Sequence, residues 1–266
     1  MAGVSKKMIF HFYANENFDK SGSNKVHLNC IKYYSRIFDE IKMIISVDDV
    51  TDLNLIKRAE NFIIEKLCYG GDLTFAVRHN TPYYECKTFR DELLIKEQDY
   101  DGLIFFGHNK GITNYDDFKE GLDIWLCGAY FLSFEFIKEV EDFLISQPGY
   151  FYGPYLTTVF EDSGTIFNKY HTYYAGTFFW INLIKHIKAC RNSDTNYMLP
   201  LDSRGYAEEY CGNFYNFKTG LTCHGLMYLY PSNLYDKKEC EAATKFLCID
   251  DETWEKYNEF KKEMTA

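Results

Sequence analysis

The chain has 266 residues, of which 46% are hydrophobic, and this is enough to bury the core of one large domain or two small ones. Its formal net charge of −10 excludes a general nucleic-acid binder, because such a protein needs a basic face to neutralise phosphates. The cysteines are scattered without a CxxC pair, and the apolar run after Lys7 is broken at His11. The sequence therefore predicts reduced thiols in the cytoplasm, with no signal segment and no transmembrane segment.

The first half of the chain alternates short apolar runs with amphipathic segments. Strands are predicted at residues 8–14, 41–47, 73–77 and 103–106. Helices are predicted between them, the first capped by Asn24, the second capped by Asp52 and stopped by Gly70-Gly71, and the third opened by Pro82. This alternation is typical of an α/β fold with a mostly parallel sheet and helices on its faces.

The second half of the chain is richer in aromatic residues. An amphipathic segment that begins at Asp116 or Asp117 and runs to Ile145 is predicted to break near Cys127-Gly128. A strand is predicted over residues 169–181, followed by a helix that Asn182 can cap. The last predicted helix covers residues 250–264.

No low-complexity linker divides the chain. We therefore interpret residues 1–266 as a single domain. Its first half, residues 1–111, is expected to bind the nucleotide, and its mixed second half, residues 112–266, is expected to bind an acceptor.

Polar residues follow each of the four predicted parallel strands. They are Tyr13 and Asn15 after the first, Asp48 after the second, Arg78 and Asn80 after the third, and His108, Asn109 and Lys110 after the fourth. In an open α/β sheet, ligands bind outside the carboxyl ends of the strands, so these residues are predicted to line the donor nucleotide. Gly107 and Gly111 let the backbone turn tightly around the last three of them.

Two possible metal sites are disfavoured. The run Asp48-Asp49-Val50-Thr51-Asp52 resembles a hard-metal cluster, but acidic residues before a helix usually act as caps. His108, His171 and His224 lack the local pairing that a zinc site needs. The sequence also contains no P-loop and no GxGxxG, GxSxG or HExxH motif.

Three pieces of the chain together resemble a family of bacterial and viral glycosyltransferases of surface and capsule glycans. The pieces are Phe105-Phe106-Gly107-His108-Asn109-Lys110-Gly111, Tyr173-Tyr174-Ala175-Gly176-Thr177-Phe178-Phe179-Trp180, and Arg204 with Ala207-Glu208. In the family the corresponding pieces look like H-T-K-G, Y-S-G-N-F-W-W and R-x-x-A-E. The resemblance runs from about residue 8 to about residue 215. It implies a GT-A-like, Rossmann-type sheet flanked by helices, with a nucleotide-sugar site.

The chain departs from the family pattern at several positions. Asn109, Ala175, Thr177 and Phe179 stand where the family has Thr, Ser, Asn and Trp. The segment His108-Asn109-Lys110 also stands where GT-A enzymes usually carry a D-x-D metal motif. Lys110 and His108 are therefore predicted to stabilise the leaving diphosphate, and the need for a divalent cation, Mn²⁺ or Mg²⁺, stays open.

The resemblance implies a hexosyl- or pentosyltransferase that moves a sugar from a UDP- or GDP-sugar to a hydroxyl of a glycan or glycoprotein, with inversion. Glu208 is the predicted general base and Glu209 the alternative, with Asp162 and Asp202 as further candidates. The residues predicted to bind the acceptor are Tyr173, Tyr174, Gly176, Trp180 and Arg204. Two other functions stay open, a non-catalytic carbohydrate-binding or scaffold protein and a nucleotidyltransferase.

Overall fold

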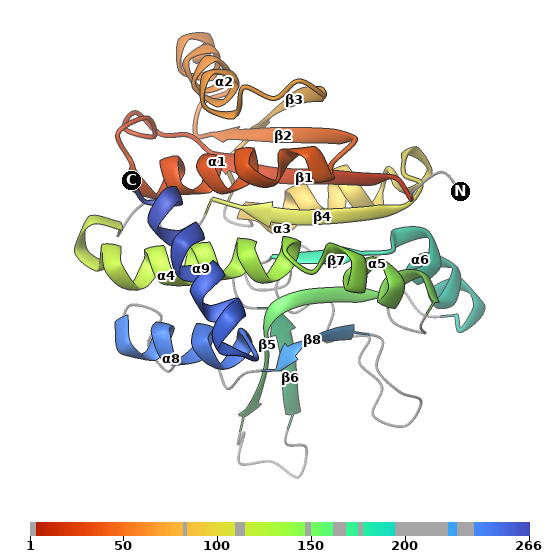
Figure 1. The fold of residues 1–266 in the computed structure, drawn as a ribbon. Helices are drawn as coiled ribbons and strands as arrows, with labels where there is room; N and C mark the ends of the chain where they lie inside the picture. Colours follow the sequence, from red (N-terminus) through yellow and green to blue (C-terminus); the bar gives the residue numbers. More distant parts are fainter. Residues whose placement is uncertain are drawn as a thin grey trace.

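The structure is a computed structural model, shown as a ribbon in Figure 1. It describes residues 4–81, 84–109, 115–146, 150–161, 169–174, 178–194, 223–227 and 237–266. The helix start predicted at Pro82 lies outside these ranges.

One mixed sheet runs through the described part of the chain. Its strands are β1 (Lys6–Tyr13), β2 (Glu40–Val47), β3 (Asp72–His79), β4 (Leu103–His108), β5 (Phe151–Glu161), β6 (Lys169–Tyr174), β7 (Phe179–Ile181) and β8 (Cys223–Met227). Their order is β3-β2-β1-β4-β7-β5-β6, and β8 pairs with β5. Strands β1 to β4 are parallel, whereas β7 is antiparallel to β4 and β5 is antiparallel to β7 and β6. The predicted α/β class, with a parallel first half and a mixed second half, is confirmed.

Helices cover both faces of this sheet (Figure 1). The larger core includes residues of α1 (Gly22–Tyr34), α2 (Leu53–Leu67), α4 (Tyr115–Phe134), α5 (Ile137–Ser146), α8 (Lys237–Leu247) and α9 (Asp251–Met264). The smaller core includes residues of α3 (Tyr84–Thr88), the π-helix η2 (Phe89–Leu94) and α6 (Leu183–Asn192). Two short 3-10 helices, η1 (Ser35–Ile37) and η3 (Glu97–Asp99), complete these elements. Among the described helices, none is both long enough and apolar enough to cross a bilayer.

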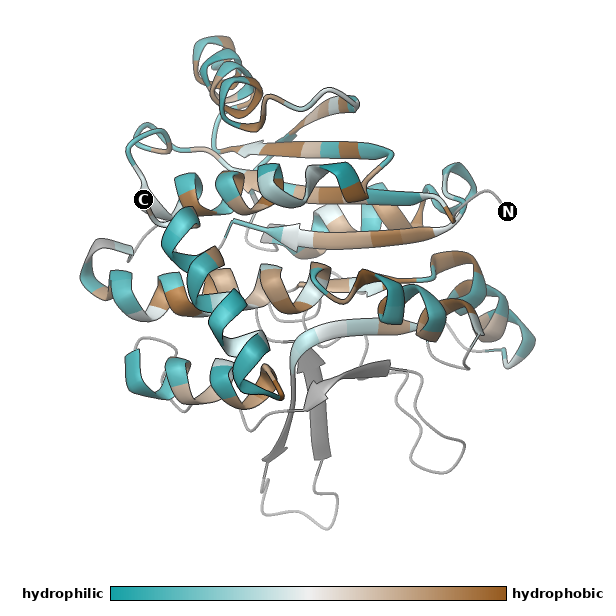
Figure 2. Cartoon of the chain, viewed as in Figure 1, coloured by the Kyte–Doolittle hydropathy of each residue, from teal (hydrophilic) through white to brown (hydrophobic). Residues whose placement is uncertain are grey.

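The central strands are buried on both faces. On β1, Phe10 packs into the larger core and Ile9 into the smaller one, and on β4 Phe105 and Phe106 divide in the same way. All four side chains are fully buried. Figure 2 shows the resulting apolar runs along β1, β2 and β4. Because neither face has room for a solvated group, polar side chains of these strands collect at their ends.

Helix α1 begins before its predicted cap. Its N-cap is Ser21, whereas Asn24 lies buried inside the helix and donates its Nδ2 hydrogen to the Phe18 carbonyl at 2.9 Å. Asn24 therefore holds the loop before the helix in place instead of capping it. The difference arises because the Asn24 amide binds a carbonyl of the preceding loop, six residues earlier, and no N–H of the helix.

The caps predicted for two later helices agree with the structure. Asp52 accepts from the Leu55 N–H at 2.9 Å, and Asn182 accepts from the Lys185 N–H at 3.2 Å. Asp250, predicted as the first residue of the last helix, instead caps α9 by accepting from the Thr253 N–H at 2.7 Å. Helix α2 nevertheless ends at Cys68, two residues before Gly70-Gly71, because Cys68 itself takes the left-handed conformation with φ 45°.

The break predicted at Cys127-Gly128 is wrong. Helix α4 runs through both residues to Phe134, and the separation from α5 follows there. A Cβ atom on Gly128 would collide with the Tyr155 hydroxyl, so this glycine permits close packing of α4 against β5. The single strand predicted over residues 169–181 is also wrong, because β6 pairs with β5 while β7 pairs with β4 and β5.

Trp180 belongs to the larger core. Its side chain is fully buried, and its ring stacks on Phe38 at a centroid distance of 5.5 Å and an interplanar angle of 12°. The indole N–H donates to the Ser133 carbonyl at 2.9 Å. An indole enclosed in this way has no open face for a sugar, so the prediction that Trp180 binds the acceptor is wrong.

Replacing Trp180 by Ala should lower the free energy of unfolding by about 3 to 5 kcal/mol, the usual cost of truncating a buried Trp. Urea denaturation would measure this loss. Trp254→Ala is the matched control, because Trp254 is only partly buried against the same core and should cost much less. Equal losses in the two variants would contradict the core assignment.

Candidate functional site

The carboxyl ends of β1, β2 and β3 meet around one carboxylate, that of Asp48. The Tyr13 hydroxyl donates to Asp48 Oδ2 at 2.9 Å, and Asn80 Nδ2 donates to Asp48 Oδ1 at 2.9 Å. The Asn80 N–H also donates to the Val47 carbonyl at 2.7 Å, which extends the pairing of β3 with β2 past the end of β3. Tyr13, Asp48 and Asn80, each predicted from a different strand, are therefore in contact.

A cavity of about 290 Å³ lies beside Asp48. Its lining residues are Ala14, Asn15, Glu16, Asn17, Asp48, Asp49, Asp52 and Leu55. Half of these residues are carboxylates, so the cavity favours ligand groups that donate hydrogen bonds and repels a bare phosphate. Asn15 and Asp48 were predicted as binding residues from the sequence, whereas Glu16, Asn17 and Leu55 were not. Glu16 and Asn17 could have been predicted, because they closely follow the end of β1.

Two of the acidic residues at this edge also shape the local backbone. Asp49 Oδ1 accepts from the Thr51 N–H at 2.8 Å and from its hydroxyl at 2.7 Å, and Asp52 caps α2. The interpretation of this acidic run as helix caps is confirmed for Asp52, whereas Asp49 stabilises the turn before the helix. In the part of the chain that the structure describes, no group of three or more His, Cys, Asp or Glu residues is arranged to hold a metal ion.

Asn109 uses its side-chain amide to join β4, β1 and α1. Its Oδ1 accepts from the Tyr13 N–H at 2.7 Å, while its Nδ2 donates to the Tyr13 carbonyl at 2.8 Å and to Asn24 Oδ1 at 2.9 Å. The residue is 5% exposed. The amide is thus occupied by protein partners, and the predicted contact of Asn109 with the donor is replaced by a role in positioning Tyr13.

His108 lies in register with His11 on the neighbouring strand, and helix α3 provides contacts to both. His108 Nδ1 is 3.7 Å from Glu85 Oε2, and His11 Nδ1 is 2.8 Å from the Thr88 hydroxyl. Burial lowers the pKa of His11 to about 4, against the opposing effect of the Glu85 carboxylate, so His11 is neutral at pH 7. Neither histidine is among the residues that line the cavity beside Asp48.

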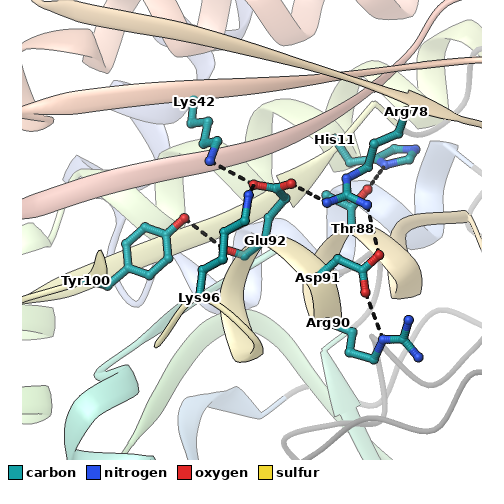
Figure 3. Close-up of polar contacts among 9 residues, drawn as sticks. All are labelled: His11, Lys42, Arg78, Thr88, Arg90, Asp91, Glu92, Lys96 and Tyr100. Atoms are coloured by element: carbon teal, nitrogen blue, oxygen red, sulfur yellow. Dashed lines mark hydrogen bonds and ion pairs between the residues drawn. The ribbon is translucent and has the colours of Figure 1, made fainter. Parts of the chain in front are cut away.

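Arg78 does not reach the cavity. Figure 3 shows its guanidinium between two carboxylates of η2: it donates to Asp91 Oδ2 at 2.9 Å and forms a second ion pair with Glu92. The Arg90 Nε–H donates to the other oxygen of Asp91 at 2.9 Å. The positive charge of Arg78 is therefore compensated within the protein, and Arg78 is not among the residues that line the cavity beside Asp48, so its contact with the donor stays a prediction.

Glu92 is the centre of this ion-pair network (Figure 3). Its side chain is 3% exposed and accepts from three cations, namely Arg78, Lys42 Nζ at 2.8 Å and Lys96 Nζ at 2.9 Å. Burial by itself raises the pKa of Glu92, but the hydrogen bonds from these three cations outweigh it and lower the pKa to about 2. The network fastens η2 to β2 and β3.

Several predicted site residues cannot be placed. Lys110, Asp162, Gly176, Asp202, Arg204, Glu208 and Glu209 lie outside the described residues. Tyr173 and Tyr174 are described only as backbone on β6, opposite Thr157 and Leu156 of β5. The geometry thus concerns the nucleotide half of the predicted site.

Comparison with known proteins gives no family assignment. No protein-family model matches the chain, and no curated protein matches it significantly. The crystal structure of S. aureus TarS 1-349 aligns with 98% of this chain and 70% of that chain, at 9% sequence identity and a TM-score of 0.39. A likeness at this TM-score assigns neither a fold family nor an activity.

The Glu92 network predicts an acid-sensitive fold. Because the pKa of Glu92 is lowered in the folded state, its contribution to stability is complete above its ordinary pKa of 4.5 and is lost as pH falls toward about 2. Glu92→Gln should lower the free energy of unfolding by about 1.5 to 3 kcal/mol at pH 7, because three partly exposed cations lose the buried carboxylate that they share. The same change should also make the free energy of unfolding fall less steeply as the pH drops from about 4.5 to about 2.

Denaturation curves measured between pH 7 and about pH 2 would test both effects. Glu252→Gln is the matched control, since its ion pair with Lys256 is exposed and should contribute only about 0.3 to 0.5 kcal/mol. If the two variants had the same stability, the network would have no central role.

Proposed function

We propose that this chain is a glycosyltransferase with a GT-A-like sheet, which takes a sugar from a nucleoside diphosphate sugar and transfers it to a glycan hydroxyl. The observation that supports this most is the joining of three parallel strand ends at Asp48, beside a cavity of about 290 Å³. Carboxyl ends of parallel strands are where open α/β sheets bind nucleotides.

The charge of the cavity indicates which part of the donor it would hold. Asp48 accepts two hydrogen bonds from the protein, from Tyr13 and Asn80, and an ionised carboxylate can accept about four. Two lone pairs therefore stay available for a base N–H or a ribose hydroxyl. With Glu16, Asp49 and Asp52 around the same space, the uncharged nucleoside fits there better than the diphosphate.

The diphosphate would then extend from the nucleoside toward the end of β4. His108 ends β4, and Lys110 follows two residues later as the predicted phosphate contact. Lys110 would compensate the charge that grows on the leaving group. The described residues include no group of three or more His, Cys, Asp or Glu residues that could hold Mn²⁺ or Mg²⁺.

The acceptor side of the proposal rests on the sequence. Glu208 or Glu209 would remove the proton from the acceptor hydroxyl, and Arg204 with Tyr173, Tyr174 and Gly176 would bind the acceptor. A cytoplasmic location is also proposed. Every cysteine whose side chain the structure describes is a free thiol, which supports a reducing compartment.

Asp48→Asn should weaken the binding of the nucleoside diphosphate, because a hydrogen bond to a charged group typically contributes about 1.5 to 3 kcal/mol. Calorimetry with UDP, GDP and their sugar conjugates would measure the change. Asp101→Asn is the matched control, because Asp101 lies exposed near the start of β4, away from the cavity. No binding of any nucleotide to the unmodified protein would refute the proposed function.

Glu208→Gln should reduce kcat by roughly 10² to 10⁴ while leaving donor binding unchanged, since a general base acts in the transition state. Glu209→Gln should have a much smaller effect if Glu208 alone removes the proton from the acceptor hydroxyl. Turnover of a glycan acceptor would test both. Nucleotide binding without any turnover would instead favour the non-catalytic carbohydrate-binding protein.

A further inference from the structure

Strand β3 forms one end of the sheet. In the strand order its neighbour is β2, so among the described strands its outer edge pairs with none. Asp72, Val77 and His79 on β3 are exposed, Val77 to 39%. An open edge of this kind presents unpaired N–H and C=O groups, which can pair with a strand of another chain.

The outward groups belong to alternate residues of β3. The Asn80 N–H donates to the Val47 carbonyl of β2, so the even-numbered residues of β3 point their backbone groups inward. The odd-numbered residues, including Leu73, Phe75 and Val77, consequently direct theirs to the open edge.

This edge lacks the features that usually prevent pairing. Strand β3 contains no Pro and no Lys, and its register with β2 continues without a bulge from Asp72 to His79. The residues between its charged ends, Leu73-Thr74-Phe75-Ala76-Val77, carry no charge. Nothing in the strand therefore opposes a second strand sterically or electrostatically.

The side-chain pattern of β3 is complementary to itself in one register. In an antiparallel pair with a two-fold axis at Phe75, Leu73 lies opposite Val77 of the other copy. Apolar pairs directly across a sheet are stabilising. A register centred on Ala76 would instead set Leu73 against His79, and this favourable pair would be lost.

We propose that two copies of this chain associate through β3, pairing antiparallel about Phe75 to form one continuous sheet. Because the two β3 strands run in opposite directions, the two candidate sites lie at opposite ends of the combined sheet. A single strand edge buries less than the roughly 1,200 to 2,000 Å² of a typical stable interface, so the dimer depends on protein concentration.

Sedimentation velocity over a concentration series tests this association. The unmodified chain should shift from one chain mass to twice that mass as concentration rises. Val77→Lys should raise the apparent dissociation constant by about tenfold, because the two-fold axis makes the change act twice across the interface. The control Ile145→Lys makes a similar change from an exposed apolar side chain to Lys on α5, outside β3, and should leave association unchanged.

Disulfide cross-linking tests the register in a Cys68→Ser background, which removes an exposed native thiol. Phe75→Cys should form a covalent dimer on mild oxidation, because paired residues at the axis have Cα atoms about 5.5 Å apart, within disulfide range. Val77→Cys should not, because its two copies would be about 13 Å apart at 3.3 Å per residue. A monomer at every concentration, or a dimer that Val77→Lys leaves intact, would overturn the proposal.

Discussion

Burial of both faces of the central parallel strands β1, β2 and β4 is the constraint on which the rest of this structure depends. Phe10 and Ile9 fill opposite cores from adjacent positions on β1, and Phe105 and Phe106 do the same on β4. A strand enclosed on both sides can carry a polar group at little cost only where the chain leaves the sheet. The candidate site is therefore at the carboxyl edge, where Tyr13, Asp48 and Asn80 meet.

The charged residues at this edge divide into two groups with different roles. Asp48 lies beside the cavity and keeps part of its hydrogen-bonding capacity for a ligand. Arg78, on the neighbouring strand, is turned toward η2 and compensated by Asp91 and Glu92. An anionic cavity that Arg78 does not line suits a nucleoside better than a phosphate, and this charge distribution orients the donor in the proposed function.

Asn109 connects the fold to the site. One amide group joins the end of β4 to the backbone of Tyr13 and to Asn24 in α1, with every side-chain contact at 2.9 Å or less. Asn24 in turn holds the Phe18 carbonyl, so the loop that contributes Asn15, Glu16 and Asn17 to the cavity is fixed at both ends. A buried amide with all its partners in place is rigid, which is the requirement for a preorganised binding site.

The sequence by itself determined the α/β class, the four parallel strands, the caps at Asp52 and Asn182, and the meeting of polar residues at one edge, because these follow from local periodicity and from the direction of parallel strands. Only the tertiary structure decided which polar residues line the cavity and which bind other side chains. Asp48 follows β2 and Arg78 lies at the end of β3, yet only Asp48 lines the cavity. The Arg78 guanidinium instead binds the carboxylates of Asp91 and Glu92 on η2. Trp180 was likewise predicted from the sequence to bind the acceptor, whereas in the structure its ring stacks on Phe38 and its N–H donates to the Ser133 carbonyl. The spacing of residues along the chain predicts which helix or strand a side chain belongs to. Its contact partners belong to other helices and strands, and only the packed structure shows which ones they are.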